Sequence, residues 1–152
     1  MMDDQEFDAL INKIQKEIFI EAKNTLGEKG FDRWRNPRYH GVMDNFDSYA
    51  RLKGDCGDTM EMYIRVKDDR IKRVSYVTDG CSSSSIAGSF TAQLATGKSF
   101  EEVLDLTGAD VVHEIGTFPK AEEHCAHLAV RTLQEAVNRF LVEQIQGEKQ
   151  RI

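Results

Sequence analysis

The chain has little of what marks fibrous, disordered or membrane-embedded proteins. It contains two prolines and 11 glycines in 152 residues, too few for a collagen-like or low-complexity sequence. No apolar run approaches the ~18 residues that a membrane-spanning helix needs. Basic residues are also outnumbered, because 20 lysines and arginines face 26 acidic residues for a formal net charge of −6. A surface that binds nucleic acid needs surplus positive charge, so we expect neither nucleic acid nor a membrane as partner.

Cysteine is scarce as well. The chain has three cysteines, an odd number that cannot pair completely into internal disulfides. The first residues, Met1-Met2-Asp3-Asp4, are acidic and do not resemble a secretory or organelle signal. We therefore expect a cytoplasmic protein with reduced thiols. The ordinary interpretation of such thiols is that they are small buried side chains, so the surroundings of each cysteine must decide whether it has a chemical role.

Hydrophobic spacing predicts a helix at the start of the chain. Apolar residues recur at intervals of three and four, Asp3 or Asp4 can cap the first turn, and Gly27 offers an end, which gives a helix over 3–27. Residues 30–47 have no sustained period and predict an ordered connector. The N-terminal apolar stripe of the predicted helix consists of Phe7, Leu10, Ile11, Ile14 and Ile18.

The middle of the chain changes to a period of two. Apolar and polar residues alternate over 59–66, which is the strongest strand pattern in the sequence. Residues 67–70 form a polar turn, and the β-branched segment 71–78 predicts a return strand. Residues 49–53 predict a shorter third strand. Together these segments predict a small antiparallel meander with one face that needs cover.

The second half of the chain is predicted to be helical. Ser82–Ser85 offer N-caps for a helix that ends at Gly97, and Ser99 with Glu102 forms a capping box for a short helix through Leu106. Residues 110–115 predict another turn or two, and one apolar face continues along a long C-terminal helix. The predicted fold class is α+β, with a small three-stranded antiparallel sheet covered by helices and a long C-terminal helix.

The three cysteines stand at the borders of predicted elements rather than inside apolar stripes. Cys56 precedes the alternating strand, Cys81 lies between the return strand and the serine-rich helix, and Cys125 is near the start of the last helix. A structural thiol more often occupies a stripe position, whereas loops and helix starts present side chains to a site. The partial positive charge at a helix N-terminus also lowers a thiol pKa, which favours thiolates at Cys81 and Cys125. At Cys125, Glu122 and Glu123 oppose this effect, which leaves the direction of the net shift open.

Asp58 and His124 are candidates for a fourth ligand. Three thiolates with either residue form a set that suits tetrahedral zinc or an iron–sulfur cluster. The chain has no Cys-x-x-Cys pair, so the residues alone leave two interpretations open, a metal or cluster site and three inert thiols. His124 and Cys125 are adjacent and point in different directions on a helix, which argues against a nucleophile–base pair.

These segments resemble a known family. The three cysteine motifs are similar to those of iron–sulfur cluster assembly scaffolds of the IscU and NifU N-terminal type. The matching segments are Cys56-Gly57-Asp58, Gly80-Cys81 and His124-Cys125 followed by Leu128-Ala129, preceded by Asn36-Pro37-Arg38 with Gly41. The resemblance covers roughly residues 30–145.

The resemblance implies a scaffold rather than an enzyme. Such a scaffold receives sulfur as persulfide from a cysteine desulfurase, receives iron, builds a [2Fe–2S] cluster and passes it to apo iron–sulfur proteins. It implies Cys56, Cys81 and Cys125 as cluster ligands, Asp58 as the aspartate that makes the cluster labile, and His124 as a further metal ligand. Members of the family also bind zinc. We predict Cys125 as the persulfide acceptor, with Cys56 second, because Cys125 has the helix start and His124 beside it.

The chain departs from the family at two places. Phe118-Pro119-Lys120-Ala121-Glu122 stands where the family carries the chaperone-recognition motif Leu-Pro-Pro-Val-Lys. Glu122 occupies the lysine position, which argues against an Hsp70-type chaperone as partner. The N-terminal helix is also longer than the scaffold needs. We therefore divide the chain into an N-terminal helix extension (1–29), a scaffold domain (30–146) and a polar tail (147–152), and leave a homodimer open.

A related branch, the SufU type, is a zinc-dependent sulfurtransferase. It resembles this chain at Cys56-Gly57-Asp58 and Gly80-Cys81-Ser82. That branch carries an insertion between the second and third cysteines and lacks the histidine before the third. This chain has no such insertion and does have His124. The cluster scaffold is therefore our first prediction, and a zinc-binding sulfurtransferase partner of a cysteine desulfurase is the alternative.

Overall fold

The structure, a computed structural model, describes residues 1–150, with the side chains of 149 and 150 left out. In chain order the elements are α1 (Asp4–Arg35), β1 (Ser48–Lys53), β2 (Thr59–Lys67), β3 (Arg70–Thr78), α2 (Ser82–Ala95), α3 (Phe100–Asp105), α4 (Gly108–Ile115), the short 3-10 helix η1 (Lys120–Glu122) and α5 (Glu123–Gln150). The predicted fold class is confirmed. The predicted tail continues α5 as far as Gln150, and its residues 151–152 lie outside the described residues.

The sheet is an antiparallel meander in the order β1-β2-β3. Met60, Met62 and Ile64 on β2 are fully buried, as the alternation predicts, and they face the helices. Asp68 and Asp69 both have positive φ angles, of 54° and 59°, in the turn between β2 and β3. Two-residue turns with this backbone match the twist of the strands that they join. All three strands were therefore predicted correctly within about two residues.

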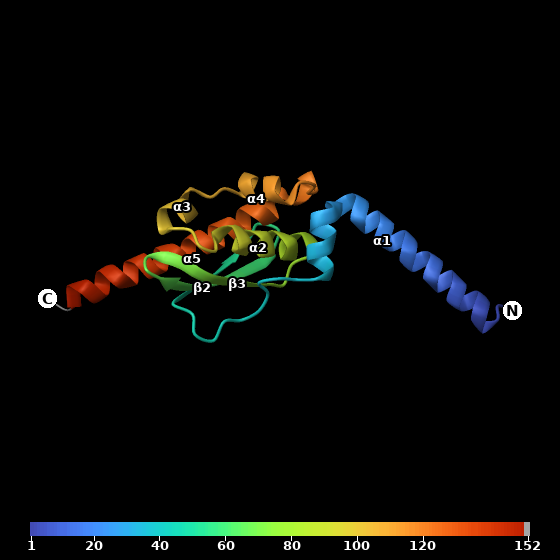
Figure 1. Cartoon of the computed structure of the whole chain (residues 1–152), viewed down its shortest axis with the longest axis horizontal. Helices are drawn as coiled ribbons and strands as arrows, with labels where there is room; N and C mark the ends of the chain where they lie inside the picture. Colours follow the sequence, from blue (N-terminus) through green and yellow to red (C-terminus); the bar gives the residue numbers. More distant parts are fainter. Residues whose placement is uncertain (151–152) are drawn as a thin grey trace.

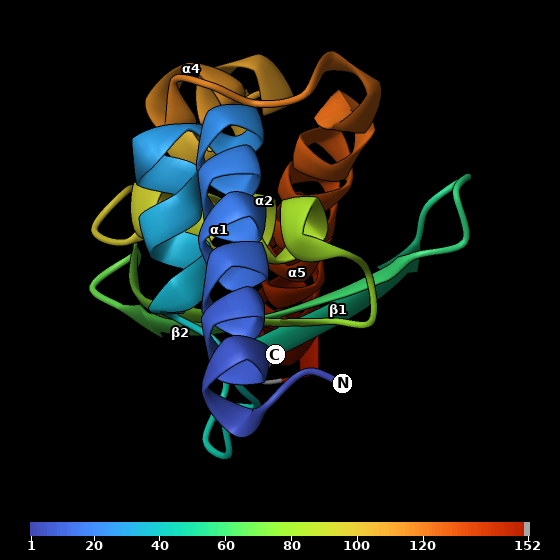
Figure 2. The ribbon, with the colours of Figure 1, turned by 90° about the vertical axis from the view of Figure 1, so that its right-hand side faces the viewer.

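The helices form two layers above the sheet (Figure 1). α2 and α5 lie on the sheet, where α5 contacts β1 and β2 and α2 contacts β3, and α4 covers α2 and α5 from the far side. Figure 2 shows α1 in front of these layers, with the sheet below. One continuous apolar core joins the sheet to α2, α4 and α5. Over residues 1–150, no helix is both long enough and apolar enough to cross a membrane.

α1 differs from the predicted N-terminal helix. Asp3 caps it in a capping box with Glu6, as predicted, but the helix does not end at Gly27. Gly27 has φ +75° and makes a kink, after which the helix continues to Arg35. A Cβ atom at Gly27 would stand 2.6 Å from Cβ of Thr117, so the close approach of these segments requires glycine here. The break predicted at Gly27 is present as this kink, whereas the connector predicted from residue 30 is wrong up to Arg35, because a second helical segment follows the kink.

The part of α1 after the kink is anchored on α2. Arg33 is buried, donates a hydrogen bond of 3.0 Å to Ser89 Oγ, and lies 4.0 Å from the ring centroid of Phe90. Burial is the largest cause that lowers the pKa of Arg33. The Arg33 side chain therefore fixes the end of α1 to α2.

The serine run does not cap α2. Cys81 itself holds the N-cap position, and no side chain caps the helix there. Ser83 and Ser84 instead are buried. The other caps follow the sequence more closely, because Ser99 and Glu102 form the predicted capping box of α3. Thr107 caps α4, which begins at Gly108, two residues before the predicted start.

Candidate metal and cluster site

The turn between β1 and β2 presents the first cysteine motif. The backbone N–H of Gly54 donates to the carbonyl of Asp58 over 2.8 Å, and the N–H of Gly57 donates to the carbonyl of Gly54 over 3.0 Å. Gly57 has φ +93°, a conformation that glycine adopts most easily. This tight turn leaves Cys56 exposed and directs the half-buried Asp58 toward the start of α2.

The segment before α2 brings the second motif against the first. The backbone N–H of Thr59 donates to Asp79 Oδ1 over 2.7 Å, and this bond is the largest cause that lowers the pKa of Asp79. A Cβ atom at Gly80 would stand 2.8 Å from Asp58 Oδ2 and 2.5 Å from Ser84 Oγ. Glycine is therefore needed at position 80 for the Asp58 carboxylate to approach α2. The next residue, Cys81, is exposed at the N-cap.

The first turn of α5 supplies the third motif. Cys125 is only 1% exposed, and its Sγ lies 3.7 Å from Glu122 Oε2 and 3.6 Å from His124 Nε2. Burial raises the pKa of the Cys125 thiol to about 12, and the Cys81 and Glu122 side chains also favour the protonated form. The helix start was expected to lower this pKa, but burial outweighs it.

Ser84 connects the first and third motifs. Its hydroxyl is fully buried and lies 3.2 Å from Asp58 Oδ2 and 3.3 Å from Cys125 Sγ. A serine hydroxyl has one proton, so it donates to only one of these two acceptors at a time. Ser84 lies three residues after Cys81, in the first turn of α2. That spacing was the signal in the sequence, and the interpretation of the serines as caps missed it.

The structure brings most of the predicted ligands together. The ligand atoms of Asp58, Cys81 and Cys125 all lie within 4.8 Å of one another, and so do those of Glu122, His124 and Cys125. Donor atoms around a tetrahedral zinc, with metal–sulfur bonds of about 2.3 Å, stand roughly 4 Å apart. The donor sets therefore suit a thiolate-bound metal with little movement. Glu122 was not predicted as a ligand.

Cys56 belongs to neither of these groups. It lines a separate cavity of about 440 Å³ at the start of α5, next to Gly54, Asp55 and Leu128. The same cavity is lined by His124, His127 and Arg131. In the described residues, the two exposed thiols are thus Cys56 on its turn and Cys81 at the helix start, while Cys125 is buried between them.

Comparison with known proteins places the chain among relatives. Residues 26–146 match the family described as NifU-like N terminal domain. Two Archaeoglobus fulgidus proteins, named iron–sulfur cluster assembly scaffold proteins IscU 1 and IscU 2, are 36% identical over 111 residues, which cover 72% of this chain and 72% of each relative. The Escherichia coli protein named iron–sulfur cluster assembly scaffold protein IscU is 31% identical over 115 residues, or 72% of this chain and 89% of that protein.

Solved structures share the fold. A NifU-like N-terminal protein from Brucella abortus aligns with a TM-score of 0.63 at 14% identity, over 78% of this chain and 96% of that chain. A putative iron–sulfur cluster assembly scaffold for the SUF system from Fervidobacterium islandicum aligns with a TM-score of 0.62 at 20% identity, over 76% and 98%. With the family match over most of its length and relatives above 30% identity, the chain belongs to the NifU-like N-terminal domain family.

Proposed function

We propose that this protein is a scaffold on which a labile [2Fe–2S] cluster is assembled and from which it is passed to apo iron–sulfur proteins. The observation that carries this proposal is the meeting of Asp58, Cys81 and Cys125 at the ends of three separate elements. The relatives named as assembly scaffolds support it, because the matched segment contains all three motifs. The cluster is cargo in this account, so the site must both hold it and release it.

The mixed thiolate and carboxylate ligands suit a cluster that the protein must release. Thiolates from Cys81 and Cys125 are soft ligands that bind iron firmly, whereas the Asp58 carboxylate is a harder ligand and binds cluster iron less well. His124 and Glu122 stand next to Cys125 and give nitrogen and oxygen alternatives at the same position. We infer that the carboxylate is the ligand that yields when the cluster moves to an acceptor.

Cys56 is the thiol that we propose as the first sulfur acceptor. The sequence favoured Cys125, but Cys125 is 1% exposed and its pKa is raised, so a partner reaches Cys56 more easily. In this step the Cys56 thiolate attacks the outer sulfur of the persulfide on a cysteine desulfurase. A persulfide forms on Cys56, and the desulfurase cysteine leaves as a thiolate. The turn of Cys56 lies beside the start of α5. In the next step the Cys125 thiolate attacks the outer sulfur of the Cys56 persulfide, so that a persulfide forms on Cys125 and Cys56 leaves as a thiolate.

Mass spectrometry tests this order of transfer. The protein is incubated with a cysteine desulfurase and cysteine, and peptides containing each cysteine are searched for added sulfur. Added sulfur on Cys56 at the earliest times supports the proposal, and a Cys56→Ser variant then delays sulfur on Cys125. Sulfur that appears first on Cys125 in the wild type, and is unaffected by Cys56→Ser, would contradict the proposal and make Cys125 the first acceptor.

Cluster transfer tests the proposed function itself. Anaerobically reconstituted protein is mixed with an apo-ferredoxin, and the spectrum of the holo-ferredoxin is followed. We expect transfer within minutes and faster than from free iron and sulfide at the same concentrations. Transfer no faster than from the free components would contradict a scaffold role.

A zinc-binding sulfurtransferase is the second candidate. The position of Cys56 outside the three-ligand group favours it, because one exposed thiol then accepts sulfur while other residues hold the metal. Metal analysis of protein purified without oxygen separates the two functions when it is combined with a desulfurase activation assay. One zinc per chain and strong activation of the desulfurase support the sulfurtransferase, whereas cluster formation without activation supports the scaffold.

A further inference from the structure

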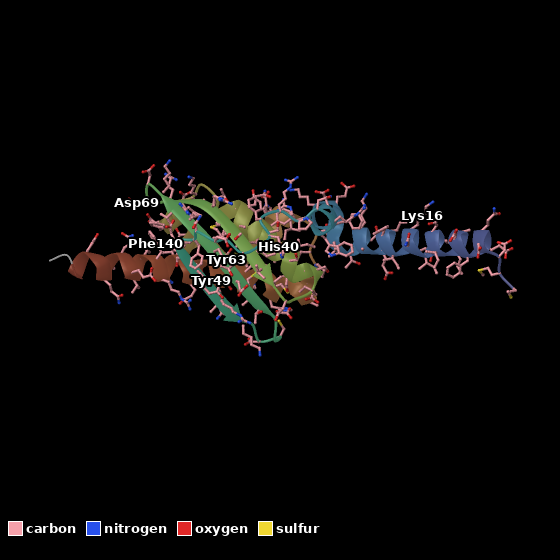
Figure 3. The ribbon with its side chains drawn as sticks, turned by 90° about the horizontal axis from the view of Figure 1, so that it is seen from below. Lys16, His40, Tyr49, Tyr63, Asp69 and Phe140 are labelled. Atoms are coloured by element: carbon pink, nitrogen blue, oxygen red, sulfur yellow. The ribbon has the colours of Figure 1, made fainter. Side chains whose placement is uncertain are left out.

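The first 23 residues of α1 stand apart from the rest of the molecule. Figures 1 and 3 show this part of the helix extending beyond the packed layers, with Lys16 about midway along it. Every residue from 1 to 21 is exposed. The contacts that hold α1 come from beyond the kink, where Lys29 donates to the carbonyl of Glu114 and Arg33 contacts α2.

The N-terminal apolar stripe is the largest exposed feature of this helix. Its five side chains are between 37% and 55% exposed. With roughly 150–200 Å² for each large apolar side chain, the stripe exposes on the order of 400 Å². Patches of this size on soluble proteins usually mark an interaction site. Helices in proteins also obtain most of their stability from packing an apolar face, so a stripe without cover predicts a partner.

We propose that this stripe is a dimer interface and that its partner is the same helix of a second copy of this chain, packed antiparallel. The proposal is independent of the cluster chemistry. It follows from the spacing, the area and the charges of residues 4–26.

Four of the five stripe residues are symmetrically spaced. Phe7, Ile11, Ile14 and Ile18 are separated by four, three and four residues, the interval of a coiled-coil seam. Read in reverse, the intervals are the same. In an antiparallel pair, Phe7 of one copy therefore faces Ile18 of the other, and Ile11 faces Ile14. Each large apolar side chain then meets another, and the two halves of the interface are equivalent, as two-fold symmetry requires.

The area agrees with a dimer of moderate affinity. Two stripes together bury on the order of 800 Å², and the aliphatic stems that flank them bring the total toward the roughly 1,200 Å² at which stable interfaces begin. The dimer is thus expected to depend on concentration rather than to be permanent.

The charges favour the antiparallel direction. Asp3, Asp4, Glu6 and Asp8 crowd the first turns of the helix. A parallel pair would put the two acidic ends side by side, whereas an antiparallel pair separates them by the length of the helix. Residues 4–26 carry five acidic and three basic residues, which also argues against an anionic membrane as the partner.

A hollow at the end of the stripe gives the pair a second contact. A cavity of about 280 Å³ lies where Ile18 and Ala22 meet Leu26, Trp34 and Ser82. In the antiparallel register, the first helical turn of one copy lies over this hollow in the other. Ser82 directly follows Cys81, so dimer formation brings the second copy close to one side of the cluster site.

Analytical ultracentrifugation of the full chain, at ~5 to ~200 µM, tests the interface. We expect a shift from monomer to dimer across this range. Ile11→Glu puts a charge into the seam and should weaken the dimer at least ~10-fold. The control is Ile20→Glu, because Ile20 is 61% exposed and lies on the opposite side of the helix. It should leave the dimer unchanged.

A charge swap tests the direction of packing. Ile11→Glu and Ile14→Lys variants should each be monomeric, and an equimolar mixture should form a heterodimer, because Glu at position 11 then faces Lys at position 14. A parallel pair would give no such rescue. The proposal is overturned by a wild type that stays monomeric at ~200 µM, by equal loss with Ile20→Glu, or by a mixture that stays monomeric. Circular dichroism confirms that each variant is folded.

Discussion

Asp58 is the residue on which the proposed cluster release depends most directly. Its carboxylate accepts a hydrogen bond from Ser84 on α2, at 3.2 Å, and stands in the ligand group with Cys81 and Cys125. We predict that Asp58→Ala gives a cluster that persists longer and moves more slowly to an apo-ferredoxin. The measurement compares transfer rates and melting temperatures of the two proteins. Unchanged transfer with a lower melting temperature would mean that Asp58 only stabilises the turn.

Ser84 is predicted to hold the ligands in position. Its hydroxyl contacts both Asp58 and Cys125, and the net free energy of such a hydrogen bond is about 1 kcal/mol or more. Ser84→Ala should therefore shorten the lifetime of the reconstituted cluster roughly fivefold. Ser85→Ala is the matched control, because the Ser85 hydroxyl pairs with Tyr76 Oη at 2.9 Å. Equal lifetimes in the two variants would refute a positioning role for Ser84.

The three thiols should differ in reactivity. Cys56 and Cys81 are exposed, whereas burial raises the pKa of Cys125 to about 12. At pH 8 only roughly one Cys125 in ten thousand is then a thiolate, since the fraction falls tenfold for each pH unit below the pKa. Iodoacetamide applied after treatment with a chelator should modify Cys56 and Cys81 first, and Cys125 only as the pH rises toward 12. Three equally slow thiols would instead support inert side chains.

At the scale of elements, the kink in α1 depends on glycine at position 27. Gly27 has φ +75°, and an added Cβ would stand 2.6 Å from Thr117. We predict that Gly27→Ala lowers the free energy of unfolding by about 1–3 kcal/mol, through backbone strain and the contact with Thr117. Gly147→Ala on α5 is the control, because nothing lies within 4 Å of its added Cβ. Urea denaturation measures the free energy of unfolding of both variants, and Gly147→Ala should not lower it. A Gly27→Ala protein as stable as the wild type would show that the kink tolerates a side chain.

The elements also show where sequence reasoning succeeds. The strand over 59–67 was predictable because its alternation has one buried face, and only one register puts Met60, Met62 and Ile64 inside. The continuation of α1 was not, because Gly27 is a stop in local terms and a kink only when Thr117 packs against it. The prediction of the α2 serines as helix caps failed because it considered only their neighbours in the sequence. Their partners, Asp58 and Cys125, are 26 and 41 residues away from Ser84.

At the scale of the whole molecule, the fold explains the site. The packing of α2 and α5 on the sheet places the β1–β2 turn, the start of α2 and the start of α5 close together, although Asp58 and Cys125 are far apart in the chain. The meeting of Asp58, Cys81 and Cys125 could be predicted from residue types and their positions at element borders. The burial of Cys125 and the separation of Cys56 could not, because both depend on how deeply α5 packs.

Anaerobic reconstitution with iron and sulfide, followed by visible absorption, tests the central claim most directly. Wild-type protein should develop the absorption of a [2Fe–2S] cluster. Cys81→Ser and Cys125→Ser should lose most of it, because serine replaces a soft thiolate with a poor ligand in the group that contains Asp58. Thr132→Ser, which keeps the buried hydroxyl on α5 and lies outside both ligand groups, should keep it. Full absorption in both cysteine variants would contradict the account.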